Sequence, residues 1–308
     1  MCRLLAGLLA LTIAGSALAQ RSVDFVIPFA PGGTADRLAL FLMPWLKTEL
    51  APHGITPMLT YRPGAGGALA AAAVARADRL QIFLAPNAVV TAAIVNPQAA
   101  NYSLSRDFVP VAYLGHAPML LMVNAQSRIK TWQDLRGHCA INTVSYGSAG
   151  LGSATHIATA LVLQHLNCKS NHVPYKGVGP AMVDLLGQHI DIVVDFVASA
   201  RPLIDNGSVR VLLSVDRKGY QSIPGLADIG YRDFDFYNWF VLLANSAATA
   251  ADITVIQQVM NRLMLNSDFR KQLADLGLLG VGQTMPADFL QQQEIKFRQI
   301  ISRTHAVQ

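Results

Sequence analysis

Two short glycine-rich turns near the start of the chain constrain its fold most strongly. They read Phe-Ala-Pro-Gly-Gly-Thr-Ala-Asp over Phe29–Asp36 and Arg-Pro-Gly-Ala-Gly-Gly over Arg62–Gly67. Each follows an apolar run typical of a strand and leads into a segment typical of a helix. Because the first N–H groups of a helix lack partners and lie at its positive end, such a turn can hold an anion. Two of them in one α/β layer predict a site where main-chain groups bind a small anionic molecule.

Neither turn has the signature of a nucleotide site. A Walker loop ends in Gly-Lys-Ser/Thr, which both turns lack. In the second turn, Gly64 and Gly66 match the start of the dinucleotide pattern G-x-G-x-x-G, but position 69 is leucine. A carboxylate therefore fits better than a nucleotide phosphate. The alternative is that these glycines only permit tight turns, and their matching positions in two loops count against it.

The N-terminus has the pattern of an export signal. Met1–Arg3 is short and basic, Leu4–Ala14 is apolar, and Ala17–Ala19 has the small-x-small form that signal peptidase cleaves. The apolar stretch is shorter than the roughly 20 residues that a membrane span needs. We expect residues 1–19 to be a signal peptide that is cleaved after Ala19, so that the mature protein is exported.

Length and charge narrow the class of protein. The mature chain is too long for one ordinary domain and suits two α/β lobes. Loss of the leader removes one arginine, so the formal net charge falls from +5 to +4, and the excess is spread along the chain. No Lys/Arg block with interleaved aromatic residues occurs, which argues against nucleic acid. A mildly basic exported protein is compatible with an acidic small ligand.

Strand and helix signals alternate along the rest of the chain, which predicts an α/β fold of mainly parallel sheets covered by helices. In the middle third we expect strands over Ala140–Val144, Val173–Tyr175 and Ile190–Phe196, with a helix over Thr155–Leu166. A further strand is expected over Trp239–Ala244, followed by a helical tail.

Two cysteines remain after cleavage, in a compartment where disulfides persist. Cys139 begins a strand-like run that ends at Gly147, and Cys168 lies just before a run that ends at Gly177. If the two strands are parallel neighbours, both cysteines fall at the same end. We therefore predict a disulfide between Cys139 and Cys168, the alternative being two separate buried thiols.

A third glycine-rich turn, Tyr146–His156, places hydroxyl groups at another helix N-terminus. Ser148, Ser153 and Thr155 are candidate ligand contacts, although serine and threonine at such positions also serve as N-caps alone. Asp195 ends an apolar strand on the side where ligands meet parallel sheets. It is a candidate partner for a ligand ammonium or hydroxyl, or else a cap for the next helix.

Signatures of catalysis are missing. The nucleophile elbow G-x-S-x-G needs glycine two residues before the serine. Ser148 has Tyr146 at that position, and Ser153 has Leu151. Neither HExxH nor a close His/Cys/carboxylate cluster occurs. We expect no enzyme, no metal site and no cofactor, with an enzyme acting on carboxylates or esters as the remote alternative.

The motifs together resemble those of the Bug receptors, the extracytoplasmic solute receptors of tripartite tricarboxylate transporters. The resemblance covers the whole mature chain and rests on segments that follow the family's order: Phe29–Asp36, Arg62–Gly67, Tyr146–His156, His172–Ala181 and Asp184–Asp195.

This resemblance implies a type II-like periplasmic binding protein with two mixed, mainly parallel sheets and a ligand cleft between two lobes. Residues 20–122 and 240–308 would form one lobe and residues 123–239 the other, with crossings near Met119–Val123 and Trp239–Leu243. The implied function is capture of a small organic carboxylate by hinge closure and its delivery to membrane permease subunits, by a monomer. An orphan receptor or a ligand presenter to a sensor kinase is the alternative.

The resemblance also implies which residues contact the ligand. Those carried over are Gly32, Gly33, Thr34, Ala65 and Gly66 in the first two turns, and Ser148, Gly152, Ser153, Thr155 and Asp195 in the other lobe. The ligand itself stays open among a dicarboxylate, an amino acid and an aromatic acid.

Overall fold

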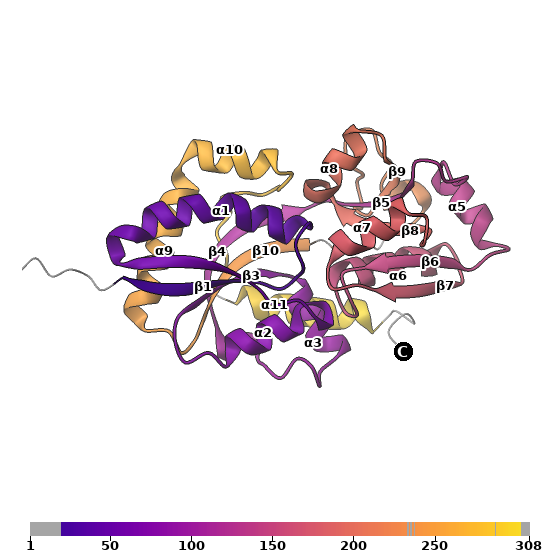
Figure 1. Ribbon diagram of the computed structural model, residues 1–308. Helices are drawn as coiled ribbons and strands as arrows, with labels where there is room; N and C mark the ends of the chain where they lie inside the picture. Colours follow the sequence, from indigo (N-terminus) through magenta and orange to yellow (C-terminus); the bar gives the residue numbers. More distant parts are fainter. Residues whose placement is uncertain (1–19, 233, 235, 237, 287, 303–308) are drawn as a thin grey trace, which may run out of the picture.

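The computed structural model describes residues 20–232, 234, 236, 238–286 and 288–302 (Figure 1). It contains two five-stranded sheets with helices packed against both. We call the part built around each sheet the first and the second lobe. The α/β class with two mixed sheets is as the sequence predicts. The predicted signal peptide lies outside the described residues, and no described helix is both long and apolar enough to cross a membrane.

The first sheet has the strand order β2-β1-β3-β10-β4. Its strands are β1 (Arg21–Ile27), β2 (Ile55–Tyr61), β3 (Gln81–Pro86), β4 (Phe108–Ala117) and β10 (Asn238–Asn245). β1 runs parallel to β2 and β3, whereas β10 is antiparallel to β3 and β4. The glycine-rich turns therefore follow the carboxyl ends of neighbouring parallel strands.

The second sheet repeats this pattern in the order β7-β6-β8-β5-β9. Its strands are β5 (Met119–Asn124), β6 (Val144–Ser148), β7 (Ser170–Pro174), β8 (Ile192–Phe196) and β9 (Val209–Ser214). β6 is parallel to β7 and β8, and β5 is antiparallel to β8 and β9. In both sheets the antiparallel strand is the one that enters from the other lobe.

The chain thus passes between the lobes at Pro118 and again between Ser214 and Asn238. The lobe limits predicted at residues 122 and 239 lie inside β5 and β10, a few residues beyond these passages.

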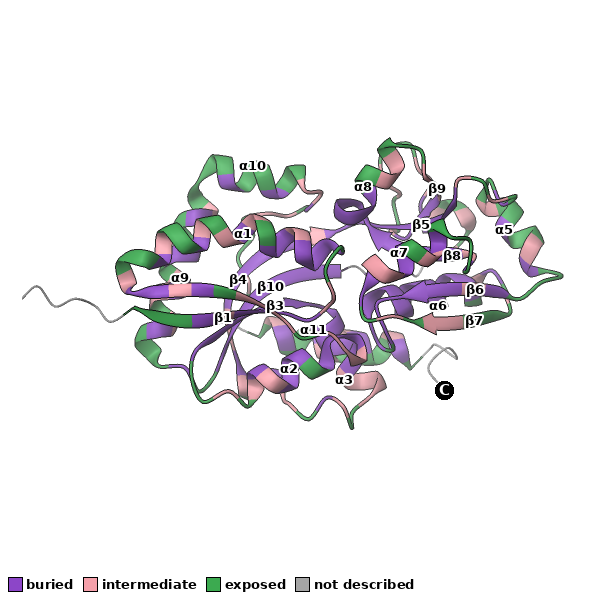
Figure 2. Ribbon diagram, viewed as in Figure 1, coloured by how far each residue is buried: buried purple, intermediate pink, exposed green. Residues whose placement is uncertain are grey.

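The helices cover the sheets and bury most of both (Figure 2). They are α1 (Thr34–Leu50), α2 (Ala68–Ala75), α3 (Ala88–Val95), α4 (Leu104–Asp107), α5 (Trp132–Cys139), α6 (Ala154–His165), α7 (Val178–Leu186), α8 (Val197–Asp205), α9 (Ala250–Leu265), α10 (Ser267–Asp275) and α11 (Phe289–Ile301). Short 3-10 turns span Ala51–His53, Ala65–Gly67 and Leu226–Ile229.

Alternate residues of β5 belong to two separate apolar clusters. Leu121 and Val123 share one with α6, whereas Leu120 and Met122 share the other with α7. Because successive strand side chains point to opposite faces, these two helices cover opposite faces of the second sheet.

One predicted element is wrong. Residues 140–143 form no strand, because α5 continues to Cys139 and β6 begins only at Val144. A capping box explains where this helix begins: Thr131 accepts from the Asp134 amide, and the Asp134 carboxylate accepts from the Thr131 amide.

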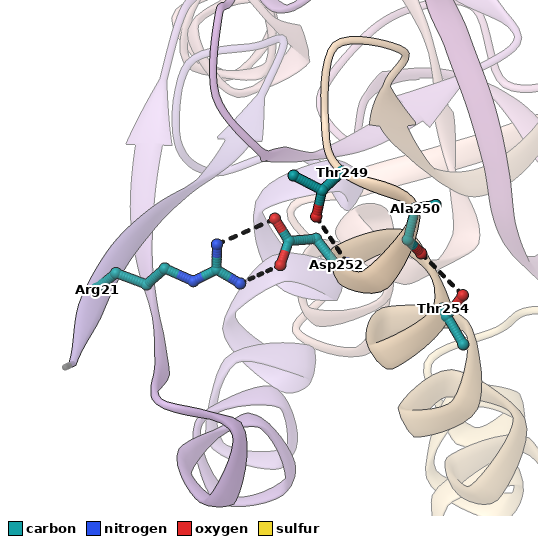
Figure 3. A network of polar contacts seen from close by, with 5 residues as sticks. All are labelled: Arg21, Thr249, Ala250, Asp252 and Thr254. Carbon is teal, nitrogen blue, oxygen red and sulfur yellow. Dashed lines mark hydrogen bonds and ion pairs between the residues drawn. The ribbon is translucent and has the colours of Figure 1, made fainter. Parts of the chain in front are cut away.

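Figure 3 shows how the first strand is tied to α9. Arg21 donates to both carboxylate oxygens of Asp252, and this bonding lowers the pKa of the Asp252 carboxyl. Asp252 lies in the first turn of α9, where its amide donates to the N-cap Thr249 at 3.2 Å. One partner is half exposed, so the pair adds little stability and mainly sets the position of α9 against β1.

A disulfide joins Cys139, the last residue of α5, to Cys168, which lies before β7. The two cysteines are close because β6 and β7 are parallel neighbours that are entered from the same end. The two runs that end at Gly147 and Gly177 are not aligned at these glycines, because Gly147 pairs with Val173 in the sheet.

Replacing both cysteines, Cys139→Ser with Cys168→Ser, should lower the free energy of unfolding by roughly 3 kcal/mol, since the unfolded chain regains the freedom of the closed loop. Urea unfolding measures this. A reductant should destabilise the wild type and leave the double variant unchanged. Two free thiols in the denatured, unreduced wild type would contradict the disulfide.

Candidate functional site

A small cavity lies between the lobes, at the edge where the parallel strands of both sheets end. Its volume is about 30 Å³, room for about two water molecules. From the first lobe it is lined by Phe29, Ala30, Gly33–Asp36, Pro86, Ala88, Asn238 and Phe240. From the second lobe it is lined by Ala149, Ser153–Thr155, Val178 and Phe196.

Five of the described helices begin at this cavity. The lining includes the first residues of α1, α3, α6 and α7, and Phe196, which directly precedes α8. Each helix N-terminus carries the equivalent of about half a positive charge and has amide groups without intrahelical partners. The lobes thus direct several positive dipole ends toward one small volume, an arrangement that favours an anion.

The side chains of the described lining residues add no positive charge, because none of them is lysine, arginine or histidine. Asp36 is the charged residue among them. Its carboxylate accepts hydrogen bonds from the Gly32 amide, at 2.9 Å, and from the Tyr61 hydroxyl. Burial and this bond raise the pKa of Tyr61 to about 12. Asp36 therefore stabilises the conformation of the first turn. The positive electrostatic field comes from main-chain groups.

The second and third turns meet across the lobes. Gly66 has φ +63°, and a Cβ there would lie 2.4 Å from the carbonyl oxygen of Leu151. Gly152 has φ +77°, and a Cβ there would lie 2.8 Å from the Cα of Ala92. Both positions therefore need glycine for their backbone conformation and for the close approach of main chain to main chain.

A buried aromatic stack supports the third turn from behind. The rings of Tyr146, His156 and His172 are stacked, with the two imidazole centroids 4.1 Å apart. His172 Nε2 lies 2.6 Å from Ser148 Oγ, and His156 Nδ1 accepts from the Gly152 amide at 3.2 Å. Burial lowers the pKa of His156 to about 3 and that of His172 to about 4. Both rings are therefore neutral near pH 7.

The hydroxyls at the start of α6 act within the turn while they line the cavity. Ser153 is the N-cap and accepts from the His156 amide at 3.2 Å. Thr155 Oγ1 accepts from the Ala149 amide at 3.0 Å and lies 3.2 Å from Ser153 Oγ.

Asp195 is fully buried at the end of β8. It accepts from the Phe196 amide at 2.7 Å and from Ser199 Oγ at 2.6 Å, so it is bonded to the residues that begin α8. Ser199 Oγ in turn lies 2.9 Å from Thr34 Oγ1 of the first lobe. Burial raises the pKa of Asp195 to about 7, against the opposing effect of these hydrogen bonds.

The structure separates the predicted site residues into two groups. Four line the cavity: Gly33, Thr34, Ser153 and Thr155. The other six are not among its lining residues: Gly32, Ala65, Gly66, Ser148, Gly152 and Asp195. Of these, Gly32 and Asp195 line a separate pocket.

Sequence reasoning missed Asn238 and the aromatic wall of the cavity. Asn238 precedes an apolar run without any turn motif, and only the position of β10 between β3 and β4 brings it to the site. Phe29, Phe196 and Phe240 come from three separate strand ends, so no local pattern joins them. No group of three His, Cys, Asp or Glu side chains among the described residues is arranged to hold a metal ion.

Comparison with known proteins places this architecture in a family. The sequence model described as the tripartite tricarboxylate transporter family receptor matches residues 52–305. A UPF0065 protein of Pseudomonas sp. is 30% identical over 295 residues, covering 91% of this chain and 87% of the relative.

Two solved structures share the fold. The periplasmic binding protein BugD has a TM-score of 0.82 at 23% identity, covering 92% of this chain and 97% of its own. MatC from Rhodopseudomonas palustris, solved with bound malate, has a TM-score of 0.80 at 25% identity, covering 91% and 99%. The chain therefore belongs to the tripartite tricarboxylate transporter receptor family, whose members are periplasmic binding receptors and not enzymes.

Proposed function

We propose that this protein captures a small organic carboxylate in the cavity between its lobes and delivers it to the permease subunits of a tripartite tricarboxylate-type transporter. The observation that carries the proposal is the convergence of five helix N-termini on a cavity whose described lining has no cationic side chain. A carboxylate is stabilised there by amides and dipoles. The malate bound to MatC belongs to the same chemical class.

Main-chain groups of the first and third glycine-rich turns are the proposed carboxylate ligands, with Gly33 and Thr34 on one side and Ser153 and Thr155 on the other. The remaining predicted residues would act indirectly, by stabilising the conformation of the turns. A cavity of about 30 Å³ holds few atoms, so a larger acid requires the lobes to lie further apart.

Hinge closure is the proposed means of capture. Direct contacts between the lobes support it: the Ala30 amide donates to the Lys176 carbonyl at 2.9 Å, and Thr91 Oγ1 donates to the Gly152 carbonyl at 2.6 Å. Two single-chain passages, at Pro118 and between β9 and β10, are the positions where backbone rotation separates such lobes.

We further propose that the protein works in the periplasm as a monomer, after cleavage behind Ala19. The leader-like pattern of residues 1–19 supports export. A periplasmic binding protein with the same fold, BugD, supports the compartment.

A thermal-shift screen of the mature protein tests the function. We would use mono-, di-, tri-, amino and aromatic carboxylates, malate and succinate included. An acid held at 100 times its dissociation constant should raise the free energy of unfolding by about 2.7 kcal/mol. If folded, ligand-free protein responds to none of these acids, the receptor proposal fails.

Substitution of Gly66 tests closure. Gly66→Ala should weaken carboxylate binding about tenfold or more, because the new methyl group meets the Leu151 carbonyl only when the lobes are together. Gly207→Ala is the matched control, since Gly207 has a similar φ of +71° and open space around it. Each variant should lose about 1 kcal/mol of stability from backbone strain. Calorimetric titration showing equal binding by both would contradict closure at this contact.

The raised pKa of Asp195 predicts a distinctive pH dependence. Between about pH 4 and pH 7 the unfolded carboxyl is ionised while the native one stays protonated. The native state therefore binds the extra proton, and this contribution to stability is full below about pH 4 and lost as the pH rises through about 7.

Asp195→Asn should remove that contribution, because the amide mimics the protonated acid at every pH. Urea unfolding from pH 4 to 8 should show the wild type losing stability relative to the variant as the pH rises. Asp205→Asn, at the exposed end of the same helix, is the control. Parallel curves for the wild type and Asp195→Asn would refute the prediction.

A further inference from the structure

Among the described residues that line the cavity, one polar side chain has no partner. Asn238 is fully buried, lines the cavity, and has neither its Nδ2 nor its Oδ1 hydrogen-bonded within the structure. Strand alternation places it on the same face of β10 as Phe240, whereas Trp239 faces the opposite way and donates to Gln293 at 3.0 Å.

Asn245, at the other end of β10, is a buried carboxamide whose two polar atoms both have hydrogen-bond partners, as is usual. Its Oδ1 accepts from the Gln81 amide at 2.8 Å, and its Nδ2 donates to the carbonyls of Ala77 and Arg79 at 2.9 and 3.0 Å. A buried polar group without such partners is unfavourable. The Asn238 carboxamide is therefore available to a group that enters the cavity.

We propose that Asn238 is a specificity-determining residue. It makes the receptor prefer carboxylates that also carry a neutral group able to donate and accept hydrogen bonds, such as a hydroxyl or a carboxamide. This inference rests on the proposed function. The reason lies in the pairing rules. A hydroxyl or an amide satisfies both Oδ1 and Nδ2, whereas a second carboxylate accepts from Nδ2 but cannot donate to Oδ1.

An ammonium group fits less well. It can donate to Oδ1 but leaves Nδ2 unpaired, and it would bring a positive charge among five helix N-termini. The rest of the described lining near Asn238 is largely apolar, with Phe196, Phe240 and Pro86 among it, so an unsubstituted acid leaves the carboxamide unpaired.

Calorimetric titration with matched pairs of acids tests the proposal. The pairs are L-lactate with propionate, L-malate with succinate, and succinamate with 4-methylpentanoate. In each pair the first acid adds a group that donates and accepts. The wild type should bind the first acid of at least one pair about 10- to 100-fold more tightly, the factor expected from leaving a buried amide unpaired.

Two variants of β10 separate recognition from structure. Asn238→Leu should abolish the preference, bringing the ratio within the pair close to one. It should leave the thermal stability of the ligand-free protein unchanged or raised, because an unpaired buried carboxamide is removed. Asn245→Leu is the matched control and should lower the melting temperature without changing the ratio, since it breaks three hydrogen bonds far from the cavity.

The outcomes distinguish this inference from the function on which it rests. Equal binding within every pair by the wild type overturns the role of Asn238 and leaves the receptor assignment intact. A stability loss in Asn238→Leu like that of Asn245→Leu, with the preference kept, shows a structural carboxamide and overturns the inference too. Failure of every acid to bind overturns the proposed function together with this inference.

Discussion

Helices that follow parallel strands all begin at the same edge of their sheet, and the site depends on this constraint. In both lobes the parallel strands end at the edge that faces the other lobe, so five helix N-termini surround one small cavity. Their combined field favours an anion, although the described lining includes no lysine or arginine side chain. The same constraint explains why the described lining contains so much main chain and so few charged side chains.

The close approach of the lobes requires glycine at particular positions. Where the second turn meets the third, main chain contacts main chain, and even a methyl group at Gly66 would overlap Leu151. Turns made so largely of glycine are intrinsically loose, since glycine has the most conformational freedom to lose. The buried stack of Tyr146, His156 and His172 compensates, because it hydrogen-bonds the third turn at two points and stays neutral near pH 7.

Among the buried polar groups described above, most are bonded within the chain, whereas both atoms of the Asn238 carboxamide are unpaired. Asp195, Asn245 and the histidine pair all have partners within the chain. Through Ser199, Asp195 is also connected by hydrogen bonds to Thr34 in the first lobe. Asn238 has no such partner, which is why it is the residue that we connect with the choice of ligand.

Local sequence was enough for the features that repeat a local rule. The glycine-rich strand-to-helix turns and the α/β alternation follow from residue order, because each depends on nearby residues. The pairing of Cys139 with Cys168 follows from the strand–helix–strand order between them, since a parallel pair brings the starts of both strands together. The absence of a strand at residues 140–143 did not follow, since α5 ends only at Cys139 and a turn separates it from β6.

Only the tertiary structure decided which residues share the cavity. Phe29, Phe196 and Asn238 are far apart in the chain and meet because β5 and β10 each cross into the other lobe's sheet. Whether a buried side chain is satisfied also depends on every neighbour that the fold brings to it. The sequence by itself therefore determined the glycine-rich turns and the helix N-termini that follow them, and the packing of the two lobes determined the walls of the cavity and its unpaired carboxamide.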